Sequence, residues 1–305
     1  MADFHVDQAA GLRRLFTQQQ LHVVTFASGA SGVGKTAVIA NVAVALARQG
    51  ENVLIVDENG GARHMGGFFG VLPAGDLLQV VNRQLALKDV LFSPAPGVQV
   101  LPAGRAARQI ARLSSAQQEA MLEGINALAE PIDVILVDSS PDHAHGFSPW
   151  GLAAGEAVMV VSGSGASITD AYALIKKVSL ALDRRHFRIL ANRVKNAREG
   201  QIIFNNLKNV ASERGVARLD YGGAIPADAR LKQLEALHQP IVEVLPESPS
   251  ALALKTFAHH MLAWPEAEYE HGGVEHFVER LLYSARAANA GALTVQARAP
   301  ETWTA

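Results

Sequence analysis

The sequence predicts an α/β protein built on one doubly wound, mostly parallel sheet, of the P-loop nucleotide-binding kind, with helical appendages at both ends. Three observations predict this fold. Short apolar runs of strand type alternate with helical segments, a glycine-rich loop joins the first run to the first helix, and 49% of the 305 residues are hydrophobic. Such alternation is typical of parallel sheets that are covered by helices on both faces.

The predicted strands follow one another along most of the chain. They are HVVTFAS, NVLIVD, GVQVLPA, DVILVD, AVMVVS, RILAN and YGGAIP. The segment TAVIANVAVALARQG, after the first strand, has helical spacing, with Val38, Val42, Ala45 and Leu46 on one face. Gly50 is the expected end of this helix, because glycine adopts the left-handed conformation that commonly closes a helix.

Four segments follow from this pattern. We expect a partner-binding helix within 1–20, a nucleotide-binding domain over 21–265 and an amphipathic helix over 272–288. Residues 289–305 show no periodicity, and we expect them to be disordered.

Composition excludes several classes of function. The chain has no cysteine, which removes disulfides and thiolate metal sites. Its formal net charge of −2 gives no general attraction to nucleic acid, so we expect no nucleic-acid partner. No secretion signal or membrane-spanning run is recognisable. We expect a cytoplasmic protein whose membrane contact, if it has one, is peripheral.

The loop GASGVGKT, Gly29 to Thr36, matches the phosphate-binding pattern G-x-x-x-x-G-K-[ST] between a strand and a helix. Its glycines allow backbone N–H groups to surround a phosphate, and Lys35 can reach the outer phosphates. Thr36 is a predicted Mg²⁺ ligand through its hydroxyl. The predicted nucleotide contacts in this segment are Gly29, Gly32, Val33, Gly34, Lys35, Thr36 and Ala37.

An aspartate at the end of a later strand is expected to complete the Mg²⁺ site. Asp138 ends DVILVD, and a carboxylate there emerges at the carboxyl edge of the sheet, beside the phosphate loop. Asp57, which ends NVLIVD, is a weaker candidate for a catalytic role. The predicted cofactors are therefore ATP or ADP with Mg²⁺.

Several strings resemble the MinD/ParA class of P-loop ATPases, and within it the flagellar number regulators FlhG and FleN. They are DQAAGLRRL, SITDAYALIKK, RILANRV, GAIPAD and EHFVERLL, spread over nearly the whole chain. The resemblance implies that Asn192, in the pair Asn192–Arg193, recognises adenine, and that the backbone near Pro226 closes over the base. An asparagine amide offers the donor and the acceptor that the adenine edge requires.

Four positions depart from the family pattern. Ala30 stands where the family has a signature lysine that reaches the partner's phosphates, and Ser31 replaces the next glycine. Asn59 stands where an aspartate orients the attacking water, and Asp142 stands where the second switch has a glycine. Loss of a charge-stabilising cation can cost on the order of 10³ to 10⁵ in rate. We therefore expect weak or absent ATPase activity, unless Glu58 supplies a substitute carboxylate or a basic residue from elsewhere in the fold replaces Ala30.

The two ends of the chain are expected to contact partners. By resemblance, the N-terminal motif binds the GTPase FlhF and stimulates it, with Gln8 as the key side chain acting in trans. The C-terminal segment has Val274, Phe277, Val278, Leu281 and Leu282 at helical spacing. In MinD-like proteins such a helix lies on the inner membrane when the ATP-bound homodimer forms, but packing against the body of the protein remains an alternative.

The sequence leaves three functions open. The first is a nucleotide-binding regulator of flagellar number or placement, which contacts an FlhF-type GTPase and a flagellar transcriptional activator or switch-complex protein. The second is an adaptor of the same fold that does not respond to nucleotide. The third is an active ParA-type ATPase. A short basic cluster at 183–188 is interpreted as a solvated surface.

Overall fold

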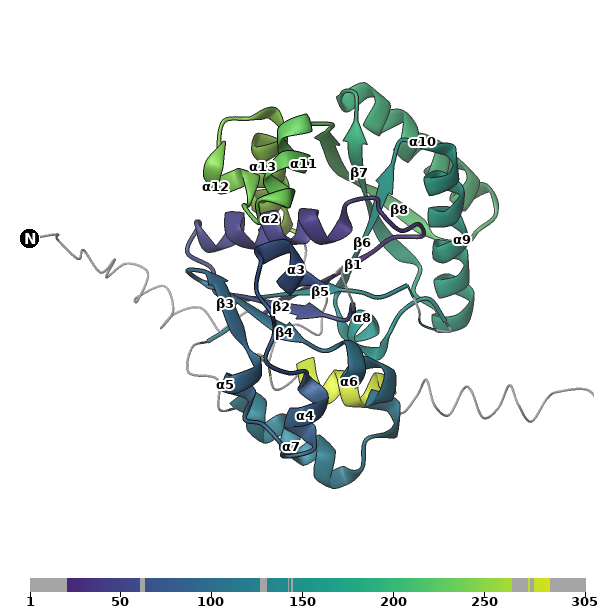
Figure 1. Cartoon of the computed structure of the whole chain (residues 1–305). Coiled ribbons are helices and arrows are strands. Elements are labelled where there is room, and N and C mark those ends of the chain that lie inside the picture. The colour runs from purple at the N-terminus through teal and green to yellow at the C-terminus, as the bar shows by residue number, and fades with distance from the viewer. Residues whose placement is uncertain are drawn as a thin grey trace, which may run out of the picture.

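The structure is a computed structural model that describes residues 21–60, 64–126, 131–141, 143, 145–264, 274 and 277–285. Its strands are β1 His22–Ala27, β2 Val53–Asp57, β3 Phe92–Ala95, β4 Val98–Pro102, β5 Val134–Asp138, β6 Glu156–Ser162, β7 His186–Val194 and β8 Arg218–Pro226. Within the described residues they form one eight-stranded sheet in the order β3-β4-β2-β5-β1-β6-β7-β8 (Figure 1).

Every neighbouring pair of strands is parallel except β3 with β4, which is antiparallel. The predicted fold class is confirmed. The sequence interpretation missed β3, which is four residues long and contains Pro94. Proline cannot donate to a neighbouring strand, so it is tolerated at this position because β3 lies at the edge of the sheet.

Helices connect most of the strands or follow the last one, and they cover both faces of the sheet (Figure 1). They are α2 Lys35–Ala47, α3 Met65–Phe69, α4 Leu77–Val81, α5 Leu87–Val90, α6 Gly104–Gln109, α7 Ser115–Asn126, α8 Pro149–Ala153, α9 Gly165–Leu182, α10 Ala197–Glu213, α11 Ala229–Ala236, α12 Ile241–Val244 and α13 Pro249–Leu262. A 3₁₀ turn, Ile110–Arg112, follows α6.

The strands alternate their side chains between two hydrophobic layers, as a sheet covered on both faces requires. In β5, Val134 and Leu136 pack into the layer that contains α2, α12 and α13. Ile135 and Val137 pack into the opposite layer, with α4, α6, α7 and α8. A third cluster covers the same face under β6, β7 and β8 and contains side chains of α9 and α10.

The sheet order places the first strand between β5 and β6, while the chain itself continues from β1 to β2 on the far side of β5. The connections therefore diverge around the carboxyl end of β1, and such a point is where open α/β sheets bind ligands. Asp57 and Asp138 end the neighbouring strands β2 and β5 and are paired in register. Both carboxyl groups thus arrive at the same edge.

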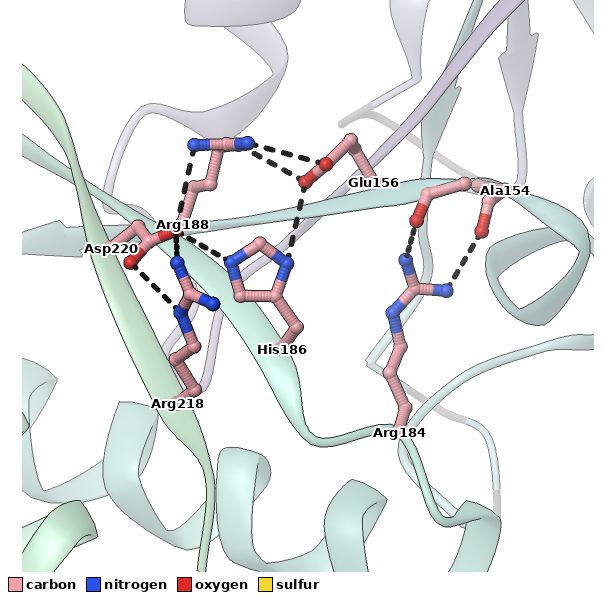
Figure 2. Close-up of polar contacts among 8 residues, drawn as sticks. Ala154, Glu156, Arg184, His186, Arg188, Arg218 and Asp220 are labelled. Atoms are coloured by element: carbon pink, nitrogen blue, oxygen red, sulfur yellow. Dashed lines mark hydrogen bonds and ion pairs between the residues drawn. The ribbon is translucent and has the colours of Figure 1, made fainter. Parts of the chain in front are cut away.

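A charged cluster lies at the amino-terminal ends of β6, β7 and β8, away from the phosphate loop (Figure 2). Arg188 is only 8% exposed and donates to both carboxylate oxygens of Glu156, over 3.0 and 3.2 Å. His186 lies 2.8 Å from Asp220, and Arg184 donates to the Ala154 carbonyl over 2.8 Å. The interpretation of 183–188 as a solvated surface is wrong for Arg184 and Arg188. The guanidinium group of Arg184 donates to the carbonyl oxygens of Ala154 and Gly155, and that of Arg188 pairs with Glu156.

The C-terminal segment packs against the body of the protein. Residues 277–285 are helical, and Phe277, Val278, Leu281 and Leu282 are buried in the layer that contains α8. The rings of Phe277 and Trp150 are 5.9 Å apart. The predicted N-terminal helix with Gln8, the segment 289–305 and Asp142 lie outside the described residues. None of the helices that the structure describes is long and apolar enough to cross a membrane.

Candidate functional site

The phosphate loop lies between the end of β1 and the start of α2. Gly34 precedes α2 in the left-handed conformation, with φ of 89°, which glycine adopts without strain. A Cβ atom at Gly34 would lie 2.7 Å from Nδ2 of Asn192. Glycine is therefore required here by both the backbone angle and the close approach of β7.

The other two glycines of the loop have different surroundings. A Cβ atom at Gly29 would lie 2.1 Å from the backbone carbonyl group of Asp170 in α9. Gly32 has φ of 76° and nothing within 4 Å of a Cβ at its position. Gly29 thus packs tightly against α9, whereas Gly32 faces open space.

Lys35, Thr36 and Asp138 form one polar cluster at the mouth of the loop. The ammonium group of Lys35 forms an ion pair with Oδ1 of Asp138 and donates to the carbonyl oxygen of Ser139. Thr36 donates from its hydroxyl to Oδ2 of Asp138 over 2.8 Å. The structure therefore brings together the lysine, the hydroxyl and the carboxylate that the sequence predicts at the phosphate and Mg²⁺ positions.

Asp57 and Asn59 lie beside this cluster. Asn59 donates from Nδ2 to Oδ1 of Asp57 over 3.2 Å and to the carbonyl oxygen of Asp138 over 3.1 Å. Asp57 also accepts from the backbone N–H of Met65. Burial, reinforced by the nearby Asp138 carboxylate, raises the pKa of Asp57 to about 7. Asp57 is therefore harder to ionise than an ordinary aspartate, because it is buried next to another carboxyl group.

Glu58 points away from the phosphate loop. Its carboxylate accepts from the backbone N–H of Ser140 over 3.0 Å and from the hydroxyl of Ser148, and His143 Nε2 lies 3.2 Å away. The side chain is buried at 1% exposure. In this structure Glu58 is therefore not placed as a substitute for the water-orienting aspartate, which the sequence left open.

A pocket of about 360 Å³ opens over the loop. Its lining residues are Ser28, Ser31, Gly32, Val33, Gly34, Lys35, Thr36, Ala37, Asn59, His64, Gly67, Phe68, Pro141, Arg193 and Glu235. This volume falls within the range of small-ligand pockets. Sequence reasoning missed His64, Gly67 and Phe68, which come from α3 and its cap, and no motif marks them. It also missed Glu235, although this residue belongs to the segment after Pro226 that was expected to close over a base.

Asn192 lies behind the loop. It is 1% exposed, and its Nδ2 donates to the carbonyl oxygen of Val33 over 2.8 Å. Its neighbour Arg193, which lines the pocket, donates to the carbonyl oxygen of Gly32 over 2.8 Å. Pro226 ends β8 and is paired in register with Val194 of β7. The predicted base-binding residues are thus next to the loop, but Asn192 uses its amide donor to hold the loop in this state.

Comparison with known proteins agrees with this geometry. A family model described as the CobQ/CobB/MinD/ParA nucleotide binding domain matches residues 24–241. The antiactivator FleN of Pseudomonas aeruginosa is 31% identical over 271 residues, which cover 89% of this chain and 97% of that protein. The flagellum site-determining protein YlxH of Helicobacter pylori is 25% identical over 85% of this chain and 89% of its own length.

Solved structures show the same fold. A chain of the MinC:MinD cell division protein complex of Aquifex aeolicus has a TM-score of 0.61 and 24% identity, over 82% of this chain and 100% of that one. The septum site-determining protein MinD of Pyrococcus horikoshii, complexed with Mg-ADP, has a TM-score of 0.56 and 23% identity, over 81% of this chain and 99% of that one. The family model and the similarity to FleN together show that the chain belongs to the CobQ/CobB/MinD/ParA family of nucleotide-binding domains, as a FleN-like member.

Proposed function

We propose that this protein is a MinD-like regulator of flagellar number or placement that binds ATP or ADP with Mg²⁺ and hydrolyses ATP slowly. The observation that supports nucleotide binding most directly is the cluster of Lys35, Thr36 and Asp138 beneath the glycine loop. It combines the cation that phosphates require with two oxygen ligands of the type that Mg²⁺ prefers.

The residues present fit a Mg²⁺-nucleotide. Gly32 leaves open space at the loop, and Lys35 is one of the residues that line the pocket. Among the described residues, the hydroxyl of Ser139 is a buried polar atom without a hydrogen-bond partner, on the residue whose carbonyl oxygen accepts from Lys35. Thr36 and Asp138 would hold the metal ion, which would neutralise phosphate charge. Lys35 would have to exchange its contact with Asp138 for the phosphates.

Slow hydrolysis follows from two residues of the site. Asn59 donates its amide to Asp57 and Asp138, and it cannot take a proton from water as a carboxylate would. Ala30 supplies no cation to a second copy of the chain in a nucleotide-linked homodimer. Both departures leave the nucleotide-holding residues in place and remove groups that would act on the attacking water or on the developing charge.

The flagellar role rests on the relatives. FleN is named an antiactivator and YlxH a flagellum site-determining protein. By analogy, the partners proposed here are a flagellar transcriptional activator or switch-complex protein, and an FlhF-type GTPase that the N-terminal motif stimulates through Gln8. Peripheral contact with the inner membrane would require the C-terminal helix to leave the layer that now buries Phe277 and Leu281.

A titration of the full chain with a fluorescent ATP analogue tests nucleotide binding. We expect saturable, Mg²⁺-dependent binding that Lys35→Ala abolishes and that Thr36→Ala makes independent of Mg²⁺. Lys88→Ala, at an exposed lysine far from the loop in sequence, is the matched control. A folded wild-type chain that binds no nucleotide at millimolar concentration would favour the adaptor function instead.

A second experiment tests the partner. The full chain is added to the cognate FlhF-type GTPase, and phosphate release is compared for wild type and Gln8→Ala. We expect Gln8→Ala to lose stimulation while it still binds, because a glutamine can position a hydrolytic water without titrating. Equal stimulation by both proteins would leave the N-terminal motif with a docking role alone.

A further inference from the structure

The peptide unit that joins Ser139 to Ser140 is held from both sides. Its carbonyl oxygen, on Ser139, accepts a hydrogen bond from the ammonium group of Lys35. Its N–H group, on Ser140, donates to Oε2 of Glu58 over 3.0 Å. In a planar trans peptide these two groups point in opposite directions. The plane therefore lies between the phosphate loop on one side and Glu58 on the other.

Glu58 is itself fixed in place. Ser148 donates to its Oε1, His143 Nε2 lies 3.2 Å from its Oε2, and its own backbone N–H donates to the carbonyl oxygen of Asp138 over 3.2 Å. With 1% of its surface exposed, the side chain has no water to turn toward. An ionised carboxylate only accepts hydrogen bonds. It can pair with the N–H of Ser140, but it would repel the carbonyl oxygen of Ser139.

The orientation of this peptide matters to a phosphate. In the present orientation the carbonyl oxygen of Ser139 faces Lys35 and accepts one of its hydrogen bonds. The loop after β5 therefore presents an acceptor on this side and uses part of the hydrogen-bonding capacity of the lysine. Phosphate oxygens require donors such as backbone N–H groups. If the peptide turned over, the N–H of Ser140 would face the phosphate side and Lys35 would lose one of its two acceptors. The carbonyl oxygen of Ser139 would then face the carboxylate of Glu58.

We propose that Glu58 is a positioning residue that acts through the Ser139–Ser140 peptide and lowers the affinity of the site for nucleoside triphosphate relative to diphosphate. The proposal rests on the proposed function, that is, on nucleotide binding at the phosphate loop. Loops that follow the strands of P-loop proteins respond to the terminal phosphate. The Glu58 carboxylate keeps the carbonyl oxygen of Ser139 turned toward Lys35, and this acceptor weakens the binding of the terminal phosphate. The binding of the inner phosphates to the glycine loop is unaffected.

Glu58→Gln is the variant that tests this idea. A glutamine amide has nearly the same shape but offers both an acceptor and donors, so it can pair with either orientation of the peptide. We expect the affinity for Mg-ATP to rise about tenfold, the equivalent of one hydrogen bond, while the affinity for Mg-ADP stays within about twofold. Glu58→Asp, which remains acceptor-only, is expected to keep the low wild-type ratio of the two affinities.

Ser148→Ala is the matched control. It removes a donor to Glu58 and the cap of α8, and it leaves the carboxylate and the Ser140 contact in place. A purely structural role of Glu58 would make Ser148→Ala and Glu58→Gln behave alike. We expect Ser148→Ala to be less stable than wild type and to keep the wild-type ratio of ATP to ADP affinity.

A second readout needs no nucleotide. Hydrogen exchange of the Ser140 amide, followed by NMR in the free protein, is expected to be faster in Glu58→Gln than in wild type. Equal changes in ATP and ADP affinity, or no change in either, would overturn the proposal. If neither protein bound nucleotide, the proposed function would fail by itself, and the Ser140 amide would then decide: faster exchange supports the Glu58 contact as an orientation lock, and unchanged exchange overturns it.

Discussion

The side-chain amide of Asn59 donates to Oδ1 of Asp57 over 3.2 Å, at the position where the MinD/ParA resemblance expects an aspartate. The same amide donates to the carbonyl oxygen of Asp138 over 3.1 Å. Both neighbours are acceptors, and an aspartate in place of the amide would add a third carboxyl group beside Asp57 and Asp138. This site is therefore built around an amide donor.

The first prediction concerns stability. Asn59→Asp is expected to lower the free energy of unfolding of the nucleotide-free protein by about 1–3 kcal/mol, because two hydrogen bonds become contacts between acceptors. Urea unfolding above neutral pH measures the difference. Asn206→Asp, at an exposed position of α10, makes the same chemical change and should be close to neutral. Equal losses at both positions would contradict this account of Asn59.

The second prediction concerns turnover. The double variant Ala30→Lys with Asn59→Asp is expected to release phosphate from ATP faster than wild type, since it restores the cation and the carboxylate of active relatives. The gain lies within the range of about 10³ to 10⁵ that such a cation supplies elsewhere. A phosphate-release assay with Mg-ATP measures it. Robust turnover by the wild type, about 1 s⁻¹ or more, would show that Ala30 and Asn59 do not limit hydrolysis.

The third prediction compares two glycines of the phosphate loop. Gly34→Ala is expected to lose nucleotide binding and to destabilise the protein, because the new Cβ would lie 2.7 Å from Nδ2 of Asn192. Gly32→Ala has a similar positive φ and open space, so it should cost only the backbone strain of about 1–2 kcal/mol. Thermal unfolding and the fluorescent nucleotide titration separate the two. Matching effects would mean that backbone strain alone explains both glycines.

The fourth prediction concerns pH. Burial and the neighbouring Asp138 raise the pKa of Asp57 from 3.8 to about 7, so the folded protein holds this proton more tightly than the unfolded chain does. The stability that the proton contributes is fully present below pH 3.8 and is lost as the pH rises through about 7. Without metal or nucleotide, Asp57→Asn should flatten the loss of stability across this window. Denaturant unfolding at several pH values measures it, and parallel pH curves for the two proteins would refute it.

The fifth prediction concerns the C-terminal helix. Phe277 is 2% exposed and packs on Trp150, so Phe277→Ala should lower the free energy of unfolding by about 3–5 kcal/mol. Tyr283 is on the same helix and 75% exposed, and Tyr283→Ala should change stability by less than about 0.5 kcal/mol. Urea unfolding of the two variants makes the comparison. A small effect of Phe277→Ala would mean that the helix is not packed on the body in solution.

Patterns among residues close together in the sequence were enough to predict the phosphate loop, the two strand-end aspartates and the fold class. The pattern Gly29 to Thr36 is contiguous, so its glycines, lysine and hydroxyl specify a phosphate loop wherever a strand precedes them and a helix follows. Apolar strands that end in Asp57 and Asp138 likewise predict two carboxyl groups at one edge, because all parallel strands end on the same side. Alternating strands and helices were enough for the fold class, while the short edge strand β3 escaped notice.

The tertiary structure decided how these groups are used. Glu58 meets Ser140 and Ser148, which lie 82 and 90 residues further along the chain, only because β2 and β5 are neighbours and their following loops meet. Asn192 reaches Val33 because β7 ends beside the phosphate loop. A sequence pattern specifies which residues stand at the end of a strand, but hydrogen bonds between two loops depend on strand order and on the competition among buried donors and acceptors. For that reason the sequence identified the phosphate loop, and only the fold assigned Glu58 and Asn59 their partners.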